Sequence, residues 1–221
     1  QLANSCSINQ GMSGLHRTIT TVRSSGIEPL GVFASDREFK ESKGYTIRNV
    51  AGIRIAFVAF TKGMDGLALP PGNEDCVNLL YTDYASTYQE VDRDGITQVL
   101  NNVQKEKPDL TVALLHWGSE FNNTISASQQ EICSLMQENG VDAIIGTHSH
   151  YVQQMTLDPA TGNFVAYSLG DFCSDAQRAG TEYSVVLELE ITKDNITDET
   201  SITGYSITPI YSYQDDDGRM R

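Results

Sequence analysis

The amino-acid sequence predicts a layered α/β domain in which at least part of the β-sheet is parallel. Two strand–helix–strand units follow one another between residues 53 and 145, and this alternation is typical of parallel strands connected by helices. Two alternating, β-branched segments, Tyr183–Ile191 and Ile202–Tyr211, indicate antiparallel strands packed on one edge. The chain has 221 residues, which suits one large domain or two small ones with a substantial core.

The chain is strongly acidic. Fifteen Lys and Arg residues against 29 Asp and Glu residues give a formal net charge of −14. Such a surface disfavours nucleic acids and anionic membranes as partners, because phosphate groups bind best to a basic face. The longest apolar run, near Ile55–Phe60, is far shorter than the roughly 20 residues that span a bilayer. We therefore expect no nucleic-acid partner and no transmembrane segment in this chain.

The chain is expected to begin with a helix. A stripe of apolar residues at helical spacing ends at Ser25-Gly26 and comprises Met12, Leu15, Ile19 and Val22. His16 lies off this stripe, so we expect a solvent-facing position for it in preference to a ligand role. The following segment, Ile27–Phe33, has the composition of a short strand.

A β-hairpin and a long loop are expected next. Tyr45–Ile47 and Ile53–Phe60 are rich in β-branched and aromatic residues, and a turn signal lies between them at Ala51-Gly52. The segment Thr61–Asn78 is rich in Gly and Pro and is predicted to be a loop. Loops of this length are uncommon in compact domains and often line a site or contact a partner.

Two helices, each followed by a strand, are expected in the second half of the chain. Asp94 is a candidate N-cap for the first helix, which is followed by the strand Leu110–His116. Ser128–Glu131 has the spacing of a capping box for the second helix, and Asn139-Gly140 is a stop signal. The segment Val141–Ile145 is then predicted to be a buried strand.

Three of the four histidines lie directly after apolar, β-prone segments. His116 ends the first of these, and His148 and His150 follow the second. A third apolar run, Phe164–Leu169, is followed by Gly170-Asp171-Phe172. Polar side chains that follow buried strands gather at one edge of an open α/β sheet, where binding sites are common. Because neutral imidazole binds zinc, manganese and iron well, the pattern indicates a metal site.

The order of these motifs resembles a known family. The strings His-Trp-Gly-Ser-Glu at 116–120, Gly-Val-Asp-Ala-Ile-Ile-Gly-Thr-His-Ser-His at 140–150 and Val-Ala-Tyr-Ser-Leu-Gly-Asp-Phe at 165–172 resemble the bacterial capsule-synthesis protein family called CapA. That family is linked to poly-γ-glutamate synthesis and is similar to the calcineurin-type metallophosphatases. The resemblance runs from Leu2 to Phe172. It implies a four-layer α/β/β/α sandwich of metallophosphatase type with mixed sheets.

The resemblance also implies roles for individual residues. His116, His148 and His150 occupy metal-ligand positions of a two-metal site for divalent ions such as Mn, Fe or Zn. Two adjacent cations polarise a phosphoryl group and lower the pKa of a bridging water. Trp117 and Glu120 accompany His116 and are candidate substrate-binding residues. Wall packing for the tryptophan and a surface charge for the glutamate are the alternative interpretations.

The N-terminal motif departs from the family pattern. Where the resemblance leads us to expect Leu-Ala-Asn-Asn-His, this chain has Leu2–Cys6, with Ser5 in place of an amide ligand and Cys6 in place of a histidine acid. A hydroxyl is a poorer metal ligand than an amide, and a thiol with a pKa of about 8.5 does not replace an imidazolium. We expect Cys6 to be catalytically inactive. Asn4, Ser5 and Asp171, which stands where the family more often has Asn, are candidate substrate-binding residues.

The domain limits follow from the same resemblance. The family's first strand, with its aspartate and histidine ligands, is expected before Leu2, so we expect this chain to be a C-terminal portion without the N-terminal strands. Residues 1–213 are expected to form a single domain, and residues 214–221 an acidic tail. Within that tail, Asp215–Asp217 is expected to be a solvated end in preference to a metal site.

Three functional interpretations remain open. The leading one is a role in capsule or poly-γ-glutamate biosynthesis with a degenerate metallophosphatase-type site. The second is an active metal-dependent hydrolase of a phosphoester or a cell-surface polymer. The third is a non-catalytic binding or assembly module of a membrane-associated polymer-synthesis complex. The resemblance also implies a location on the extracellular side of a bacterial membrane, through an anchor upstream of this chain.

Overall fold

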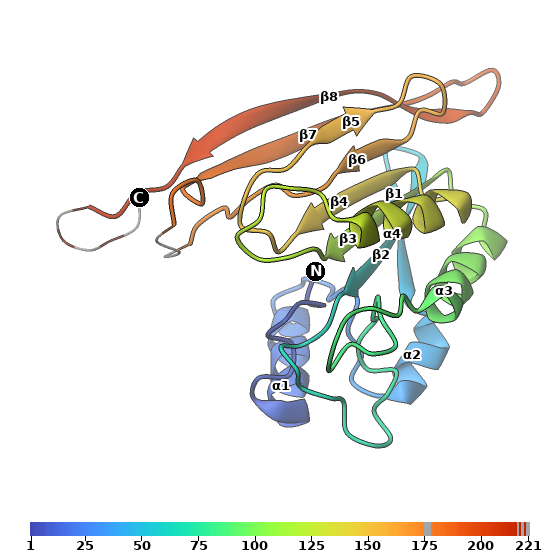
Figure 1. The fold of residues 1–221 in the computed structure, drawn as a ribbon. Helices are drawn as coiled ribbons and strands as arrows, with labels where there is room; N and C mark the ends of the chain where they lie inside the picture. The colour runs from blue at the N-terminus through green and yellow to red at the C-terminus, as the bar shows by residue number, and fades with distance from the viewer. Residues whose placement is uncertain (175–177, 216, 218, 220–221) are drawn as a thin grey trace.

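The computed structural model describes residues 1–174, 178–215, 217 and 219 (Figure 1). The helices are α1 (Gly11–Ser24), α2 (Asp36–Ser42), α3 (Arg93–Lys105) and α4 (Ala127–Glu138). The strands are β1 (Tyr45–Val50), β2 (Ile53–Thr61), β3 (Leu110–His116), β4 (Ala143–Thr147), β5 (Met155–Leu157), β6 (Phe164–Ala166), β7 (Tyr183–Lys193) and β8 (Thr200–Tyr211). They form a mixed six-stranded sheet and a separate two-stranded sheet, which confirms the predicted α/β class with mixed sheets.

The six-stranded sheet has a parallel centre and antiparallel edges. Its strand order is β1-β2-β3-β4-β6-β5, with β2, β3, β4 and β6 parallel and with β1 and β5 antiparallel to their neighbours. In the register of the parallel strands, Thr61 pairs with His116 and His116 pairs with Thr147. The C-terminal ends of β2, β3 and β4 are therefore level. This register places both histidine strings at one edge of the sheet.

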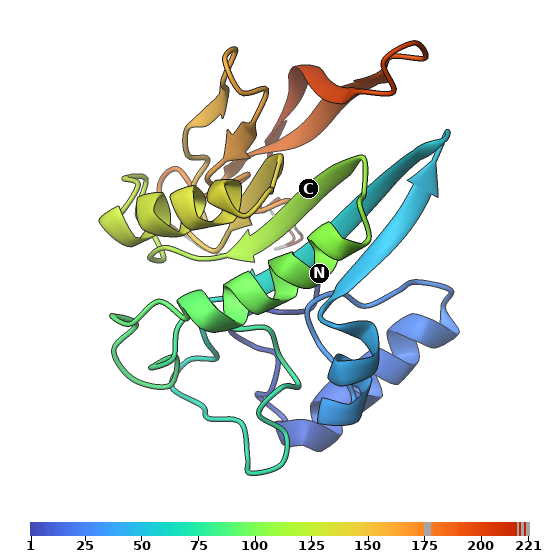
Figure 2. The ribbon, with the colours of Figure 1, turned by 90° about the vertical axis from the view of Figure 1, so that its right-hand side faces the viewer.

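Helices cover one face of the six-stranded sheet and the β7–β8 hairpin covers the other (Figures 1 and 2). Apolar residues of α3 and α4 pack with alternate residues of the central strands; among these are Val58, Phe60, Leu115, Ile96, Leu100, Ile132 and Met136. The opposite face packs against the hairpin through a second set that includes Leu110, Val112, Phe164, Leu187, Leu189 and Ile202. These are three of the four expected layers. In the described ranges, no helix covers the outer face of the hairpin.

The hairpin itself is a long antiparallel pair. β7 and β8 pair from Tyr183 with Tyr211 to Lys193 with Thr200, and a bulge lies between Glu190 and Ile191. This pairing confirms the predicted antiparallel strands. Because this sheet has only two strands in the described part of the chain, the outer edge of β8 has no strand beside it. None of the helices described has the length and apolar character needed to cross a bilayer.

The predicted strand Ile27–Phe33 is wrong. Only Val32 forms an isolated bridge there, with Val77, and the amide of Phe33 donates to the carbonyl of Cys76. Gly31 explains the irregular path, because it has a φ of +81° and a Cβ at that position would lie 2.8 Å from the carbonyl oxygen of Ala59. The segment therefore satisfies its backbone groups with the long loop instead of with a sheet.

The predicted loop Thr61–Asn78 is confirmed except that Thr61 ends β2, and part of the loop belongs to the core. Met64, Cys76 and Val77 are buried in a cluster with Leu15 and Ile19 of α1. The loop thus fixes α1 beside the end of β2. The short helix α2 and the three-residue strand β5 were not predicted, because neither is long enough to show a helical or strand period.

Both predicted helix caps are shifted by two residues. Asp92 is the N-cap of α3 and accepts a hydrogen bond from the amide of Gly95, while Asp94 lies inside the first turn. Ser126 is the N-cap of α4 and forms a capping box with Gln129. The predicted capping box, between Ser128 and Glu131, is not formed. Ser126 and Ser128 are each followed three residues later by Gln or Glu, so the sequence fits either capping box. The residue at which the helix begins decides which one forms. The strands Val141–Ile145 and Phe164–Leu169 are present with shifted or shortened limits.

Replacing Ser126 with alanine is expected to lower the free energy of unfolding by about 1 kcal/mol, because the backbone amide of Gln129 at the start of α4 loses its side-chain acceptor. The matched control is Ser128→Ala, which removes a hydroxyl two residues later that bonds the hydroxyl groups of Ser126 and Tyr81. Chemical denaturation of both variants measures the difference. If Ser128→Ala lowered the free energy of unfolding as much as Ser126→Ala or more, Ser128 would be the N-cap, as the sequence predicts.

Candidate functional site

The three predicted histidines lie at the C-terminal ends of β3 and β4. His116 is the last residue of β3, and His148 and His150 lie in the turn that follows β4. Both turn histidines have left-handed backbone angles, with φ of 98° for His148 and 62° for His150. Positive φ is uncommon outside glycine and is concentrated at sites that the surrounding structure holds in place. The turn thus directs two imidazoles to the sheet edge where β3 ends.

His116 and His148 form a half-buried pair. Their ring centroids are 4.4 Å apart. Nε2 of His116 lies 3.2 Å from the hydroxyl of Ser5, and its Nδ1 lies 3.3 Å from the hydroxyl of Thr147. Burial lowers the pKa of His116 to about 4 and, with the added effect of His116, the pKa of His148 to about 3. Both rings are therefore neutral at pH 7.

His150 has different partners. Its Nδ1 lies 2.6 Å from Oδ2 of Asp171, and its Nε2 lies 3.8 Å from Oε1 of Glu120. The ring of Phe121 stacks on the imidazole with centroids 4.6 Å apart and planes 7° apart. The structure therefore brings Glu120 and Asp171 together around His150, and it places His116 and His148 in a separate pair.

The N-terminal motif reaches the site through Ser5. The side chain of Asn4 is used inside its own turn, where Oδ1 accepts from the amide of Cys6 and Nδ2 donates to the carbonyl of Leu2. Ser5 is buried against His116. Cys6 is exposed and carries a free thiol. Of these predicted residues, Ser5 is thus the one whose side chain contacts a site histidine.

Trp117 lies behind the site. Its side chain is fully buried on the helical face of the sheet, its Nε1 donates to the carbonyl of Tyr167 at 2.9 Å, and its ring stacks on Tyr167. A Cβ on Gly146 would lie 2.3 Å from Nε1 of Trp117, so the glycine permits this close packing. The position supports wall packing as the role of the tryptophan.

A cavity of about 730 Å³ opens beside the histidine pair, between the sheet edge and the hairpin. Its lining includes His116, His148 and Asp171 on one side and Val185 and Leu187 of β7 on the other. The cavity thus combines a few polar groups with an apolar wall, which is typical of small-molecule sites.

Lys62 is a site residue that the sequence did not predict. It directly follows β2, its Nζ donates to the carbonyl of Gly118 at 2.8 Å, and it lies over the ring of Tyr88. Burial lowers the pKa of this lysine, and Glu120 and Asp65 oppose that change. Its charge in turn lowers the pKa of His116 and His148. The three histidines lie at the edge of the sheet where β2, β3 and β4 end, which we call the histidine edge. The position of Lys62 directly after a buried strand was the feature of the sequence that could have placed it there.

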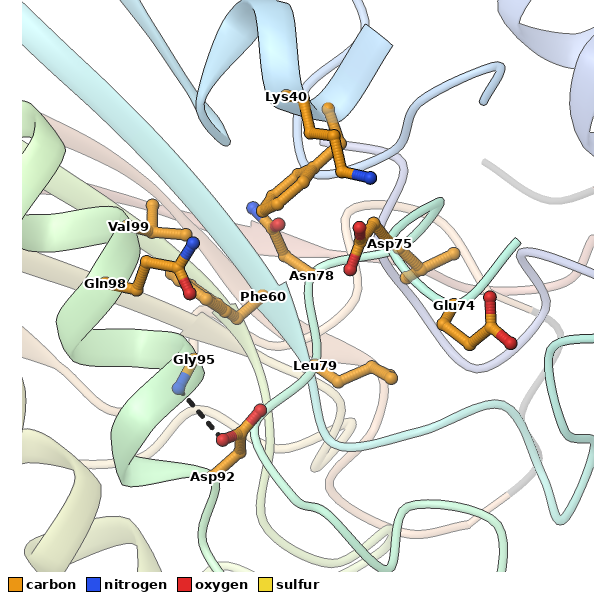
Figure 3. Close-up of a pocket in the computed structure, with 12 residues that line it drawn as sticks. Lys40, Phe60, Glu74, Asp75, Asn78, Leu79, Asp92, Gly95, Gln98 and Val99 are labelled. Atoms are coloured by element: carbon orange, nitrogen blue, oxygen red, sulfur yellow. Dashed lines mark hydrogen bonds between the residues drawn. The ribbon is translucent and has the colours of Figure 1, made fainter. Parts of the chain in front are cut away.

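A second cavity, of about 350 Å³, lies between α2, α3 and the loop before Tyr81 (Figure 3). Phe60 and Val99 are among its apolar wall residues, and Glu74 and Asp75 lie at its rim. Burial and the neighbouring Asp36 raise the pKa of Asp75. No histidine lines this cavity, so it is separate from the predicted site.

The donors in the described residues do not complete a metal centre. Neutral imidazoles suit divalent transition metals, but a two-metal centre needs further donors and usually a carboxylate. In the described residues, no cluster of three or more His, Cys, Asp and Glu side chains is arranged to hold a metal ion. The partners of His116 are two hydroxyl groups, and a positively charged lysine lies near the pair. The residues shown here therefore do not fit two metal ions by themselves.

Fold and site together define a mixed α/β protein with a histidine site at the C-terminal ends of its parallel strands, the usual location in such sheets. The chain belongs to the family described as bacterial capsule synthesis protein PGA_cap, whose model matches residues 1–176. The resemblance to the capsule-synthesis family is thereby confirmed.

Curated relatives come from several bacteria. The capsule biosynthesis protein CapA of Bacillus anthracis is 26% identical over 196 residues, which cover 89% of this chain and 44% of the relative. The PGA biosynthesis protein CapA of Bacillus subtilis (strain 168) is 24% identical over 213 residues, which cover 94% and 49%. A probable polyglutamine synthesis accessory protein of Mycobacterium tuberculosis (strain CDC 1551 / Oshkosh) is 23% identical over 200 residues. The chain spans about half the length of these relatives.

The solved structures that this chain resembles have low sequence identity to it. A hypothetical protein from Thermus thermophilus has a TM-score of 0.47 and 13% identity, and the match covers 76% of this chain and 62% of that one. A putative 5'-nucleotidase from Staphylococcus aureus in complex with alpha-ketoglutarate has a TM-score of 0.47 and 12% identity, with 79% and 32% covered. The family assignment rests on the sequence match.

Proposed function

We propose that the protein takes part in the synthesis of a bacterial capsule polymer of the poly-γ-glutamate type and that its metallophosphatase-type site is degenerate. Family membership supports the first part, together with the capsule and PGA biosynthesis named for its relatives. We further propose that the protein works on the extracellular side of the membrane within a polymer-synthesis complex.

The observation that carries the degenerate site is the environment of His116. Its two ring nitrogens lie beside the hydroxyl groups of Ser5 and Thr147. A hydroxyl supplies no negative charge to offset a divalent cation, and Lys62 adds a positive charge near the same ring. These residues suit hydrogen bonding to a ligand in the adjoining cavity: each neutral imidazole has one donor and one acceptor nitrogen.

The test uses the full-length protein and has two readouts. Metal analysis is expected to give fewer than two equivalents of transition metal, with weak phosphoesterase turnover. Polymer formation in cells that lack the gene is expected to return with the wild-type protein and to be lost with His148→Ala. His16→Ala is the matched control, because this histidine is exposed on α1. Two bound metal ions with strong phosphoesterase turnover would contradict the degenerate site.

An active metal-dependent hydrolase is the second candidate. The low pKa of His116 and His148 favours it, because metals bind the neutral form of imidazole. In that case His148→Ala removes both metal uptake and hydrolysis of a phosphoester, with polymer formation following the loss of turnover. Residues outside these 221 would have to supply the remaining donors.

A further inference from the structure

His150 has a close carboxylate partner at its edge and an aromatic ring on its face. Asp171 contacts its edge through Nδ1 at 2.6 Å, and Phe121 covers its face with the two planes only 7° apart. The guanidinium of Arg178 in turn lies 3.9 Å from the centroid of the Phe121 ring. The imidazole is therefore restrained both in its plane and against rotation.

The partner at Nδ1 also decides where the ring proton lies. An ionised carboxylate only accepts hydrogen bonds, so a neutral His150 that bonds Asp171 must carry its proton on Nδ1. Nε2 is then unprotonated. The partners of His116 are hydroxyl groups, which both donate and accept, and they leave either tautomer possible.

We infer that Asp171 is a positioning residue that fixes His150 in the Nδ1–H tautomer and presents an unprotonated Nε2 at the site. That nitrogen lies 3.8 Å from a carboxylate oxygen of Glu120, so two hydrogen-bond acceptors stand side by side. A ligand group that reaches them must donate hydrogen bonds or carry a positive charge. This inference rests on the proposed function only in taking the histidine edge as the ligand site.

An asparagine at position 171 would act differently. Its amide presents an acceptor oxygen and a donor nitrogen, and a flip of the side chain exchanges them. It therefore accommodates both tautomers of His150. Asp171→Asn keeps the size of the side chain and removes its charge, which separates positioning from packing.

The direct test is nitrogen-15 spectroscopy of the histidine side chains in the full-length protein. Spectra at about pH 8, where ordinary imidazole is neutral, are assigned by comparison with His150→Gln. The wild type is expected to show a protonated Nδ1 and an unprotonated Nε2 for His150. Asp171→Asn and Asp171→Ala are expected to shift both nitrogens toward a tautomer average, while the exposed control Asp94→Asn leaves them unchanged.

Either of two results overturns the inference. One is an Nε2–H tautomer, or protonation of both nitrogens, in the wild-type protein. The other is an unchanged Nδ1–H tautomer in Asp171→Asn, a variant whose fold is verified by its amide spectrum. These outcomes concern the ring proton alone and hold whatever the protein does in the cell.

A second readout connects the tautomer to function. In cells that lack the gene, Asp171→Ala is expected to lower polymer formation roughly 10-fold, the lower end of the loss caused by removing a group that orients a metal-bound histidine. Asp171→Asn is expected to recover part of that loss. Unchanged polymer formation together with a lost tautomer supports the positioning role and contradicts the proposed function of the histidine edge.

Discussion

Replacing Trp117 with alanine is expected to lower the free energy of unfolding by about 3–5 kcal/mol, the usual cost of removing a large aromatic side chain from a core. The side chain is fully buried between the sheet and its helices, and its loss also leaves the carbonyl of Tyr167 without the indole donor. Because Gly146 packs directly on the indole, the space left by the removed side chain would lie beside the turn that carries His148. Denaturant unfolding measures the change.

Two further variants make this expectation specific. Trp117→Phe keeps an aromatic ring against Tyr167 and is expected to cost clearly less than alanine. Phe172→Ala removes an aromatic side chain that is 73% exposed and is expected to stay within about 0.5 kcal/mol of the wild type. A Trp117→Ala loss as small as that of Phe172→Ala would mean that the tryptophan is not a core residue.

The protein is expected to lose stability as the pH falls from about 6.5 to about 4. In this window the unfolded histidines bind protons, while burial keeps the folded His116, with a pKa of about 4, and His148, with a pKa of about 3, neutral. The unfolded state then binds more protons, so the free energy of unfolding decreases with falling pH. One pKa unit corresponds to about 1.4 kcal/mol, so His116 alone contributes roughly 3 kcal/mol.

A double variant isolates this contribution. His116→Gln combined with His148→Gln removes both imidazoles and is expected to flatten the stability profile between about pH 6.5 and 4, whatever its stability at pH 7. His16→Gln, at an exposed position on α1, is expected to keep the wild-type slope. Both are measured by denaturant unfolding across the pH series. A double variant with an unchanged slope would show that other groups govern acid sensitivity.

Sequence patterns identified the parts of the fold that have a clear period. The hairpin around Ala51-Gly52 and the buried strand Leu110–His116 were predicted correctly, because continuous β-branched segments and turn residues mark them. Ile27–Phe33 has the same composition and is not a strand, because its backbone bonds with a loop that is distant in sequence. The prediction of the α4 cap was wrong for a different reason. Two serines, Ser126 and Ser128, both have the spacing of a capping box, and the sequence does not distinguish them.

The location of the site could be predicted from the sequence. The separation of His150 from the pair formed by His116 and His148 could not. Strand ends that are level in a parallel sheet bring His116, His148 and His150 to one edge, and this follows from the order of strands and motifs. The separation of His150 from the other two depends on left-handed backbone angles in the turn after β4. No period encodes such angles at non-glycine residues. Lys62 was missed because a single lysine after a strand resembles any other surface charge.

The open edge of β8 affects how the protein behaves in solution. From Thr200 to Tyr211 this strand has no charged residue, and in the described part of the chain nothing pairs with its outer edge. Charged side chains are a common protection of such edges against pairing between molecules, and here Pro209 and the bulge after Glu190 give only local protection. Mutual repulsion at a net charge of −14 is the remaining barrier. Salt shortens the reach of that repulsion to about 8 Å at physiological ionic strength, so colloidal stability falls as salt is added.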